Sequence, residues 1–173
     1  ASDFLERADM HIETYPADVL RKKAKPLTEY GTPAKHIYEE MLETMYENKG
    51  VGLAAPQVSK SLRFFIFDIS PEQKDPIVLI NPEIVEYTGS KSSTEGCLSL
   101  PELEATVKRA EKIKVRARDL EGRPVTFEAE GLMAVVIQHE LDHLDGMMLV
   151  DRMSRLQKIR ARKKHLYLRS FKK

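Results

Sequence analysis

Apolar residues recur at helical spacing in two long stretches of the chain, the first after Thr32-Pro33 and the second after Gly131. A threonine followed by proline is typical of a helix start, so we expect Thr32 to cap the first helix and Pro33 to lie in its first turn. Gly50 is a natural end for this helix. Its expected apolar stripe consists of Ile37, Met41, Leu42 and Met45.

Shorter apolar runs between the two helices predict β-strands. Residues 62–68 include four consecutive apolar side chains, which indicates a strand buried on both faces. A second short strand is expected over 77–80. Asn81-Pro82 follows it directly, and this pair is typical of a turn, so we expect the strand to end there.

Alternating residues predict a strand hairpin later in the chain. Apolar and basic residues alternate over 113–118, as in a half-buried strand. Turn-forming residues at 121–124 then lead into a partner strand over 125–129. The stretch 95–101 is interrupted by glycine and proline, and we expect it to form a loop rather than a core strand.

The order of elements predicts the fold class. A helix is followed by several antiparallel strands, the helix that begins at Gly131, and a basic helix from about Ser154 to Leu168. This order indicates an α+β fold in which antiparallel sheets wrap around the helix at 131, which becomes the central helix. The length fits one domain, residues 1–173, with 154–173 as a basic C-terminal helix or tail.

Composition narrows the possible functions. A content of 42% hydrophobic and 32% charged residues is typical of a globular protein, and a net charge near +1 gives no general attraction to DNA or membranes. No apolar run reaches the length of a membrane span, and residues 1–7 lack the apolar core of a signal peptide. The single cysteine cannot form an intrachain disulfide, which fits a reducing compartment such as the cytoplasm.

The strongest chemical signal is His139-Glu140-Leu141-Asp142-His143 on the expected central helix. Residues four apart share one face of a helix, so both imidazoles can bind one metal ion. Glu140 would then lie beside a bound water as general base, as in metal-assisted hydrolysis. The alternative is an exposed helix with two solvated histidines. The almost entirely apolar residues 131–138 argue against it, because a histidine pair at their end would be buried and need partners.

Two histidines and a water leave one position of a tetrahedral metal site to fill. Cys97 is the natural candidate, because its thiolate would stabilise a divalent ion. A lone cysteine is more often an inert buried residue. Glu95 could complete the set instead, and the residues alone leave both possibilities open.

The segment 50–57 reads Gly-Val-Gly-Leu-Ala-Ala-Pro-Gln. Two glycines at this spacing allow close approach of another backbone, although an ordinary turn explains them too. Gln57 has apolar neighbours, and an uncharged amide near a metal could stabilise an oxyanion. Leu132, Val135 and Val136 share the side of His139, so we expect them to form an apolar substrate pocket with Val51. Gly52 would let a substrate backbone add to it like a strand.

Taken together, 50–57, 95–99 and 138–143 resemble the three sequence boxes of the bacterial-type peptide deformylases. The resemblance extends from about Tyr15 to the basic tail. It implies removal of the formyl group from N-formylmethionyl nascent peptides. It implies one divalent metal on Cys97, His139 and His143, with Glu140 as base and then acid, and with Gln57 and the Leu98 N–H holding the oxyanion.

The metal itself stays open at this point. One thiolate and two imidazoles suit zinc by softness and geometry. The family resemblance instead implies Fe2+ as the physiological ion, with Ni2+, Co2+ or Zn2+ as substitutes. It also implies contact with the ribosome through the C-terminal helix, in the cytoplasm of a bacterium or inside an organelle.

Two other functions are compatible with part of the pattern. A zincin-type metallopeptidase shares the two histidines and the glutamate, but its third ligand would come from further downstream, where Asp145, Asp151 and His165 are the candidates. A ribosome- or RNA-binding protein with a structural metal would explain the basic tail, in which ten residues from Arg152 to Lys173 are Lys or Arg. We expect Leu156, Ile159 and Leu166 to dock this helix while its cations point outward.

Overall fold

The structure is a computed structural model, and it describes residues 10–170. The segment 1–9, which we expect to carry no signal peptide, and the last three residues of the basic tail lie outside the described residues. None of the helices in the described part is long and apolar enough to cross a membrane.

The described chain contains three α-helices, seven strands and several short 3-10 helices, which confirms the predicted α+β class. The helices are α2 (Thr32–Glu47), α3 (Gly131–Leu144) and α4 (Arg155–Lys164). The strands are β1 (Gly52–Ala54), β2 (Phe64–Phe67), β3 (Ile77–Thr88), β4 (Lys91–Cys97), β5 (Leu100–Arg109), β6 (Lys112–Arg118) and β7 (Pro124–Glu130). The 3-10 helices are η2 (Asp18–Arg21), η3 (Ala55–Val58), η4 (Leu149–Arg152) and η5 (Leu166–Ser170).

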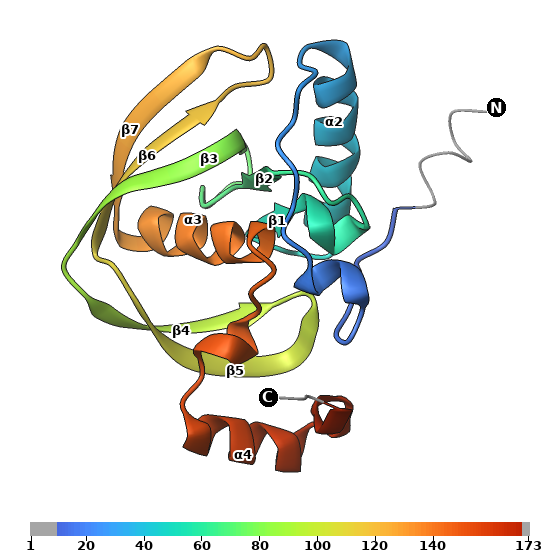
Figure 1. Ribbon diagram of the computed structural model, residues 1–173, viewed down its shortest axis with the longest axis vertical. Helices are drawn as coiled ribbons and strands as arrows, with labels where there is room; N and C mark the ends of the chain where they lie inside the picture. Colours follow the sequence, from blue (N-terminus) through green and yellow to red (C-terminus); the bar gives the residue numbers. More distant parts are fainter. Residues whose placement is uncertain (1–9, 171–173) are drawn as a thin grey trace.

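All strand pairs between these elements are antiparallel, and they form two separate sheets. The larger sheet has the order β1-β2-β3-β6-β7, and the smaller one is the β4–β5 hairpin. Helix α3 crosses the middle of the molecule with the long strands curving around it, and α2 packs against β1 and β2 to one side (Figure 1). The expected wrapping of sheets around a central helix is therefore present.

In β2 and α2, the buried residues are those that the apolar pattern predicts. All four residues of β2 are buried, as expected for a strand covered on both faces. In α2, Met41 and Met45 are fully buried and Ile37 and Leu42 pack beside them. Both ends of α2 differ slightly from the prediction. The N-cap is Gly31 instead of Thr32, which already lies inside the helix, and the C-cap is Asn48, just before the expected end at Gly50.

The expected end of β3 at Asn81-Pro82 is wrong. The strand continues to Thr88 through a break in register after Ile80. Asn81 has a φ of 51°, and its side-chain amide bonds both the backbone N–H and the C=O of Leu27, at 2.8 and 3.0 Å. These tertiary bonds stabilise a bulge at a pair that would otherwise favour a turn.

The expected loop over 95–101 is also wrong. Residues up to Cys97 belong to β4, and β5 starts at Leu100, so only a two-residue turn separates the strands. Leu103, Ala105 and Val107 of β5 are buried at alternate positions, with charged or polar residues between them. Burial of this alternating face holds the hairpin together despite its glycine and proline.

The basic tail forms a helix, but its docked side is opposite to the expected one. Leu156, Ile159 and Leu166 are 55%, 43% and 70% exposed, whereas Ala161 and Leu168 are buried. The amide of Gln157 bonds the backbone N–H and C=O of Thr106 in β5, both at 2.9 Å, and so sets the rotation of α4.

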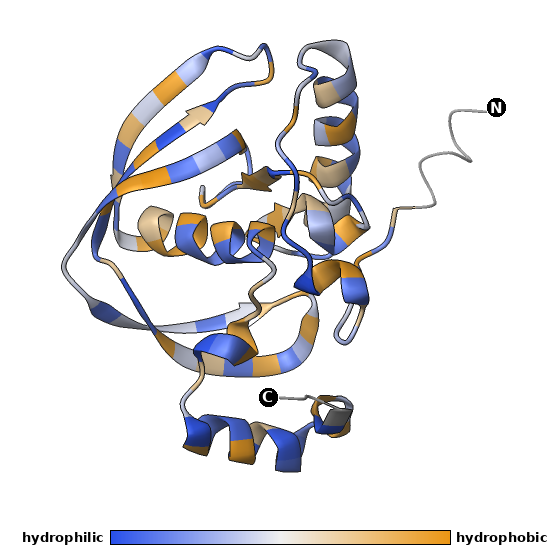
Figure 2. Ribbon diagram, viewed as in Figure 1, coloured by the Kyte–Doolittle hydropathy of each residue, from blue (hydrophilic) through white to orange (hydrophobic). Residues whose placement is uncertain are grey.

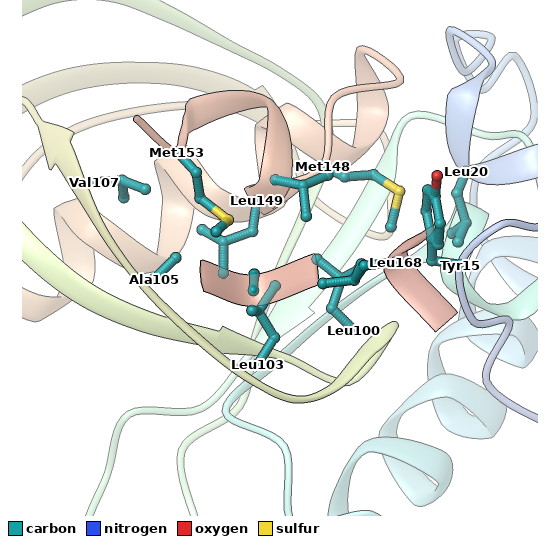
Figure 3. Close-up of a cluster of buried hydrophobic side chains, with 12 residues drawn as sticks. Tyr15, Leu20, Leu100, Leu103, Ala105, Val107, Met148, Leu149, Met153 and Leu168 are labelled. Atoms are coloured by element: carbon teal, nitrogen blue, oxygen red, sulfur yellow. The ribbon is translucent and has the colours of Figure 1, made fainter. Parts of the chain in front are cut away.

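One apolar cluster links this tail to the hairpin and to the N-terminal segment (Figure 3). Leu168 packs in it with Tyr15, Leu20 and Leu100. The outer side of α4 is mostly hydrophilic with apolar residues at intervals (Figure 2). The C-terminal part of the chain is thus joined to the core through β5.

Candidate active site

Three potential metal ligands meet at one point. Cys97 is the last residue of β4, and His139 and His143 lie four residues apart on α3. One ligand atom from each lies within 4.8 Å of the others, and the Cys97 Sγ is 3.3 Å from the His143 Nε2. One thiolate and two imidazoles at this spacing fit a single tetrahedral ion with a fourth position for water. The cluster therefore indicates one metal site.

Electrostatics favour a thiolate at this cluster. Burial raises the pKa of the Cys97 thiol, but the imidazoles of His143 and His139 more than reverse this effect, so its pKa lies well below the usual value. A deprotonated sulfur is the form that binds metal.

Glu95 orients a ligand instead of replacing Cys97. Its Oε1 accepts a hydrogen bond from the His139 Nδ1 at 2.9 Å, and both of its oxygens accept from the buried Arg109 at 2.7 and 2.9 Å. Burial raises the pKa of Glu95, but these hydrogen bonds outweigh it and bring the pKa to about 2. An ionised Glu95 fixes the imidazole so that its Nε2 faces the ligand cluster.

The network behind the ligands was missed by the sequence analysis. Arg109 also donates to Asp142 at 2.8 Å, and Arg152 donates to both oxygens of Asp142. Asp142 stands inside the histidine motif, which was one available signal. Arg109 is the last residue of β5 on its buried face, and a charged side chain at a buried position indicates a buried partner.

Glu140 lies next to the ligand His139 on α3, and one of its carboxylate oxygens is unpaired. Its side chain is buried, and its Oε1 is 3.9 Å from the His139 Nε2. Its Oε2 has no hydrogen-bond partner in the described structure. Burial raises the pKa of Glu140, although the two ligand imidazoles oppose this shift. A buried carboxylate without a partner is costly and typical of a functional group.

Gln57 points its amide nitrogen toward the cluster. Its Oε1 accepts from the Ala54 N–H at 3.0 Å, which directs the Nε2 to the Ser99 Oγ at 3.0 Å and to the Cys97 Sγ at 3.7 Å. Leu98 lies in the turn after Cys97. Gln57 therefore faces the cluster from η3, and Leu98 lines the pocket beside it from the turn between β4 and β5.

A pocket of about 480 Å³ opens beside these groups. Glu140, His139, Gln57 and Cys97 line its inner end. Its walls include all five residues expected to bind substrate, namely Val51, Gly52, Leu132, Val135 and Val136. Val51 and Leu132 are largely exposed and Val135 is buried, so the pocket runs from the surface toward Glu140.

Gly52 lies directly against the Glu140 carboxylate. A Cβ at this position would lie 2.9 Å from the Glu140 Oε1, closer than side chains tolerate. The absence of a side chain at Gly52 therefore leaves room for the Glu140 carboxylate.

None of the three downstream candidates for a zincin-type third ligand, Asp145, Asp151 and His165, belongs to the ligand cluster. Asp145 pairs with Arg63, and Asp151 pairs with Arg21. Within residues 10–170, the only metal-competent group is the one that contains Cys97.

The family model for polypeptide deformylase matches residues 9–159 of the chain. The chain belongs to the peptide deformylase family. Its family membership identifies the chain as a peptide deformylase, which is a hydrolase, and the Cys-His-His cluster indicates that it binds a metal ion.

Solved structures with the same fold include several peptide deformylases. The enzyme from Legionella pneumophila is 44% identical with a TM-score of 0.85, covering 90% of this chain and 92% of that chain. The enzyme from Thermotoga maritima is 44% identical with a TM-score of 0.80, covering 84% and 97%. The Synechococcus elongatus enzyme, solved in complex with actinonin, is 39% identical with a TM-score of 0.85, covering 90% and 87%.

Proposed function

We propose that this chain removes the N-formyl group from N-formylmethionine at the start of newly synthesised polypeptides and releases formate. The observation that carries the proposal is a buried, unpartnered Glu140 oxygen next to a Cys-His-His cluster at the end of an apolar pocket. The test is formate release from formyl-Met-Ala-Ser, with metal content measured on the same sample. Cleavage of an internal peptide bond without formate release would favour a metallopeptidase.

Cys97, His139 and His143 would hold the metal ion. When bound, a divalent ion supplies Lewis acidity and makes hydroxide available near neutral pH. Glu140 accepts the proton of the attacking water and returns it to the leaving amine, so that formate and a free methionine N-terminus result.

Gln57 and Leu98 stabilise the charge that develops on the formyl oxygen. The Gln57 Nε2 is already turned toward Cys97 by the bond from Ala54 to its oxygen. The Leu98 N–H provides the second donor. Each such donor is typically worth about 3 kcal/mol of the barrier.

We propose Fe2+ as the physiological ion, on the basis of the family resemblance, with Zn2+, Ni2+ or Co2+ in purified samples. Air should inactivate the ferrous form faster than the nickel form, through oxidation of iron or of the Cys97 thiolate. Equal half-lives of the two forms in air would count against iron.

Specificity for methionine would come from the pocket walls Val51, Leu132, Val135 and Val136, and Gly52 would let the substrate backbone lie close. Losing one or two methylenes of apolar contact is worth about 1–3 kcal/mol. Formyl-Ala peptides should therefore have a clearly lower kcat/KM than formyl-Met peptides. Equal values for the two substrates would remove the pocket from the model.

We further propose that α4 holds the enzyme at the ribosome, which would place it in the cytoplasm of a bacterium or inside an organelle. Arg160, Lys163 and Lys164 are exposed on α4, and basic side chains bind RNA phosphate by counterion release. Binding should therefore weaken steeply as salt rises.

Charge reversal is the cleanest test of this contact. Truncation after Ser154 would also remove Ala161 and Leu168 from the core. Arg160→Glu combined with Lys163→Glu leaves that packing intact and should reduce co-sedimentation with ribosomes at low salt. A matched variant that reverses the exposed Lys22 and Lys23 provides the control. Equal sedimentation of all three proteins would refute the contact.

A further inference from the structure

The N-terminal segment 13–15 forms backbone hydrogen bonds to two separate parts of the site. The Glu13 N–H donates to the Gln57 C=O at 2.6 Å, and the Tyr15 N–H donates to the Ser99 C=O at 2.9 Å. Gln57 and Ser99 are almost completely buried. Two bonds two residues apart thus join η3 to the turn between β4 and β5.

No strand pairing joins these two parts. Gln57 follows β1 of the five-stranded sheet, whereas Ser99 lies in the separate β4–β5 hairpin. Apart from the N-terminal segment, the direct polar contacts between them are those of the Gln57 Nε2 with the Ser99 Oγ and the Cys97 Sγ. The distance between the two proposed oxyanion donors therefore depends on contacts outside the sheets.

The segment is itself firmly anchored. Tyr15 is buried among Leu20, Leu100 and Leu168 (Figure 3). At its other end, the Ser59 Oγ donates to the Glu13 Oε1 at 2.6 Å. A short segment fastened at both ends can hold its two acceptors at a defined separation.

We propose that residues 13–15 act as a positioning clip that sets the Gln57 amide relative to the Leu98 N–H. This inference rests on the proposed function, since it assumes that both groups meet the same oxyanion. Catalytic donors lose much of their effect when displaced by a fraction of an ångström. The clip should therefore affect kcat more than KM, because the oxyanion forms only in the transition state.

The test compares two substitutions at one position. Glu13→Pro removes the backbone N–H, whereas Glu13→Ala keeps it and removes only the side-chain contacts with Ser59 and His11. Glu13→Pro should lower kcat for formyl-Met-Ala-Ser by roughly tenfold with little change in KM. Glu13→Ala loosens one anchor of the segment but keeps both backbone bonds, so it should lose clearly less kcat than Glu13→Pro. In the cobalt form, both variants should keep the visible spectrum of the parent, because the metal ligands are untouched.

A double-mutant cycle separates positioning from general destabilisation. In a Gln57→Ala background, Glu13→Pro should have little further effect on kcat, because the donor that it positions is gone. An equal loss in both backgrounds would overturn the clip. If Glu13→Pro does not fold, a chain that starts at Thr14 is compared with one that starts at Glu13, because both lack Met10 and Ile12 and only the second keeps the Glu13 nitrogen.

The outcomes distinguish the clip from the proposed function. If the parent enzyme releases no formate, the proposed function fails and the clip with it. If the parent is active but Glu13→Pro matches Glu13→Ala in kcat, only the clip fails.

Discussion

Replacing Glu140 with glutamine tests the centre of the proposed mechanism. Gln has nearly the same shape and can occupy the same buried space, but it cannot accept a proton from water. The three metal ligands come from other residues, so the metal should stay bound. The substitution therefore removes the general base while the site keeps its form.

The structure supports a large effect on rate. Glu140 is only 4% exposed, and its Oε2 has no hydrogen-bond partner within residues 10–170. Glu95, another carboxylate that lines the pocket, is held by His139 and Arg109 and so is not free to replace Glu140 as base. General-base catalysis typically contributes 10²- to 10⁴-fold, which corresponds to about 3–5 kcal/mol of barrier. We expect kcat to fall by roughly a thousandfold with KM largely unchanged.

The assay is formate release per bound metal ion, with metal content determined on the same sample. Glu43→Gln, at an exposed position of α2, makes the same chemical change away from the site and should behave like the parent enzyme. If Glu140→Gln retains its rate per bound metal, the assignment of Glu140 as base is refuted.

Three further substitutions test other parts of the site. Cys97→Ser should lower metal content sharply, because a hydroxyl is a poor anionic ligand at neutral pH; unchanged content would put a carboxylate in its place. Arg152→Met removes a partner of Asp142 and should weaken metal affinity about tenfold in competition with a chelator. An unchanged affinity would show that the rest of the network suffices. Gly52→Ala should cut kcat by about tenfold without loss of metal, because its Cβ would crowd the Glu140 Oε1 at 2.9 Å; a rate equal to the parent would show that the carboxylate does not need this space.

Local periodicity was sufficient where neighbours in the sequence are also neighbours in space. The two histidines share a face of α3 because a helix repeats every 3.6 residues. The four buried residues of β2 and the stripe of α2 follow from the same kind of pattern. For these elements the apolar positions alone determined both the type of structure and the buried side.

Patterns of turn residues were less reliable. Asn81-Pro82 and the Gly96–Pro101 region both favour turns locally, yet the chain continues as strand through the first and forms a hairpin at the second. In each case long-range contacts outweighed the local preference, through the bonds from Asn81 to Leu27 and through burial of one face of β5.

The sequence by itself determined the chemistry that this protein has available: a histidine pair on one helical face, a carboxylate beside it, one thiol and an apolar central helix. Only the tertiary structure decided which groups meet. Cys97 reaches His143 from 46 residues away, and Glu95 binds His139 instead of the metal cluster. The rotation of α4 depends on Gln157 finding Thr106 in another element. Such pairings depend on which surfaces are buried together and which polar groups then need partners, and no local pattern contains that information.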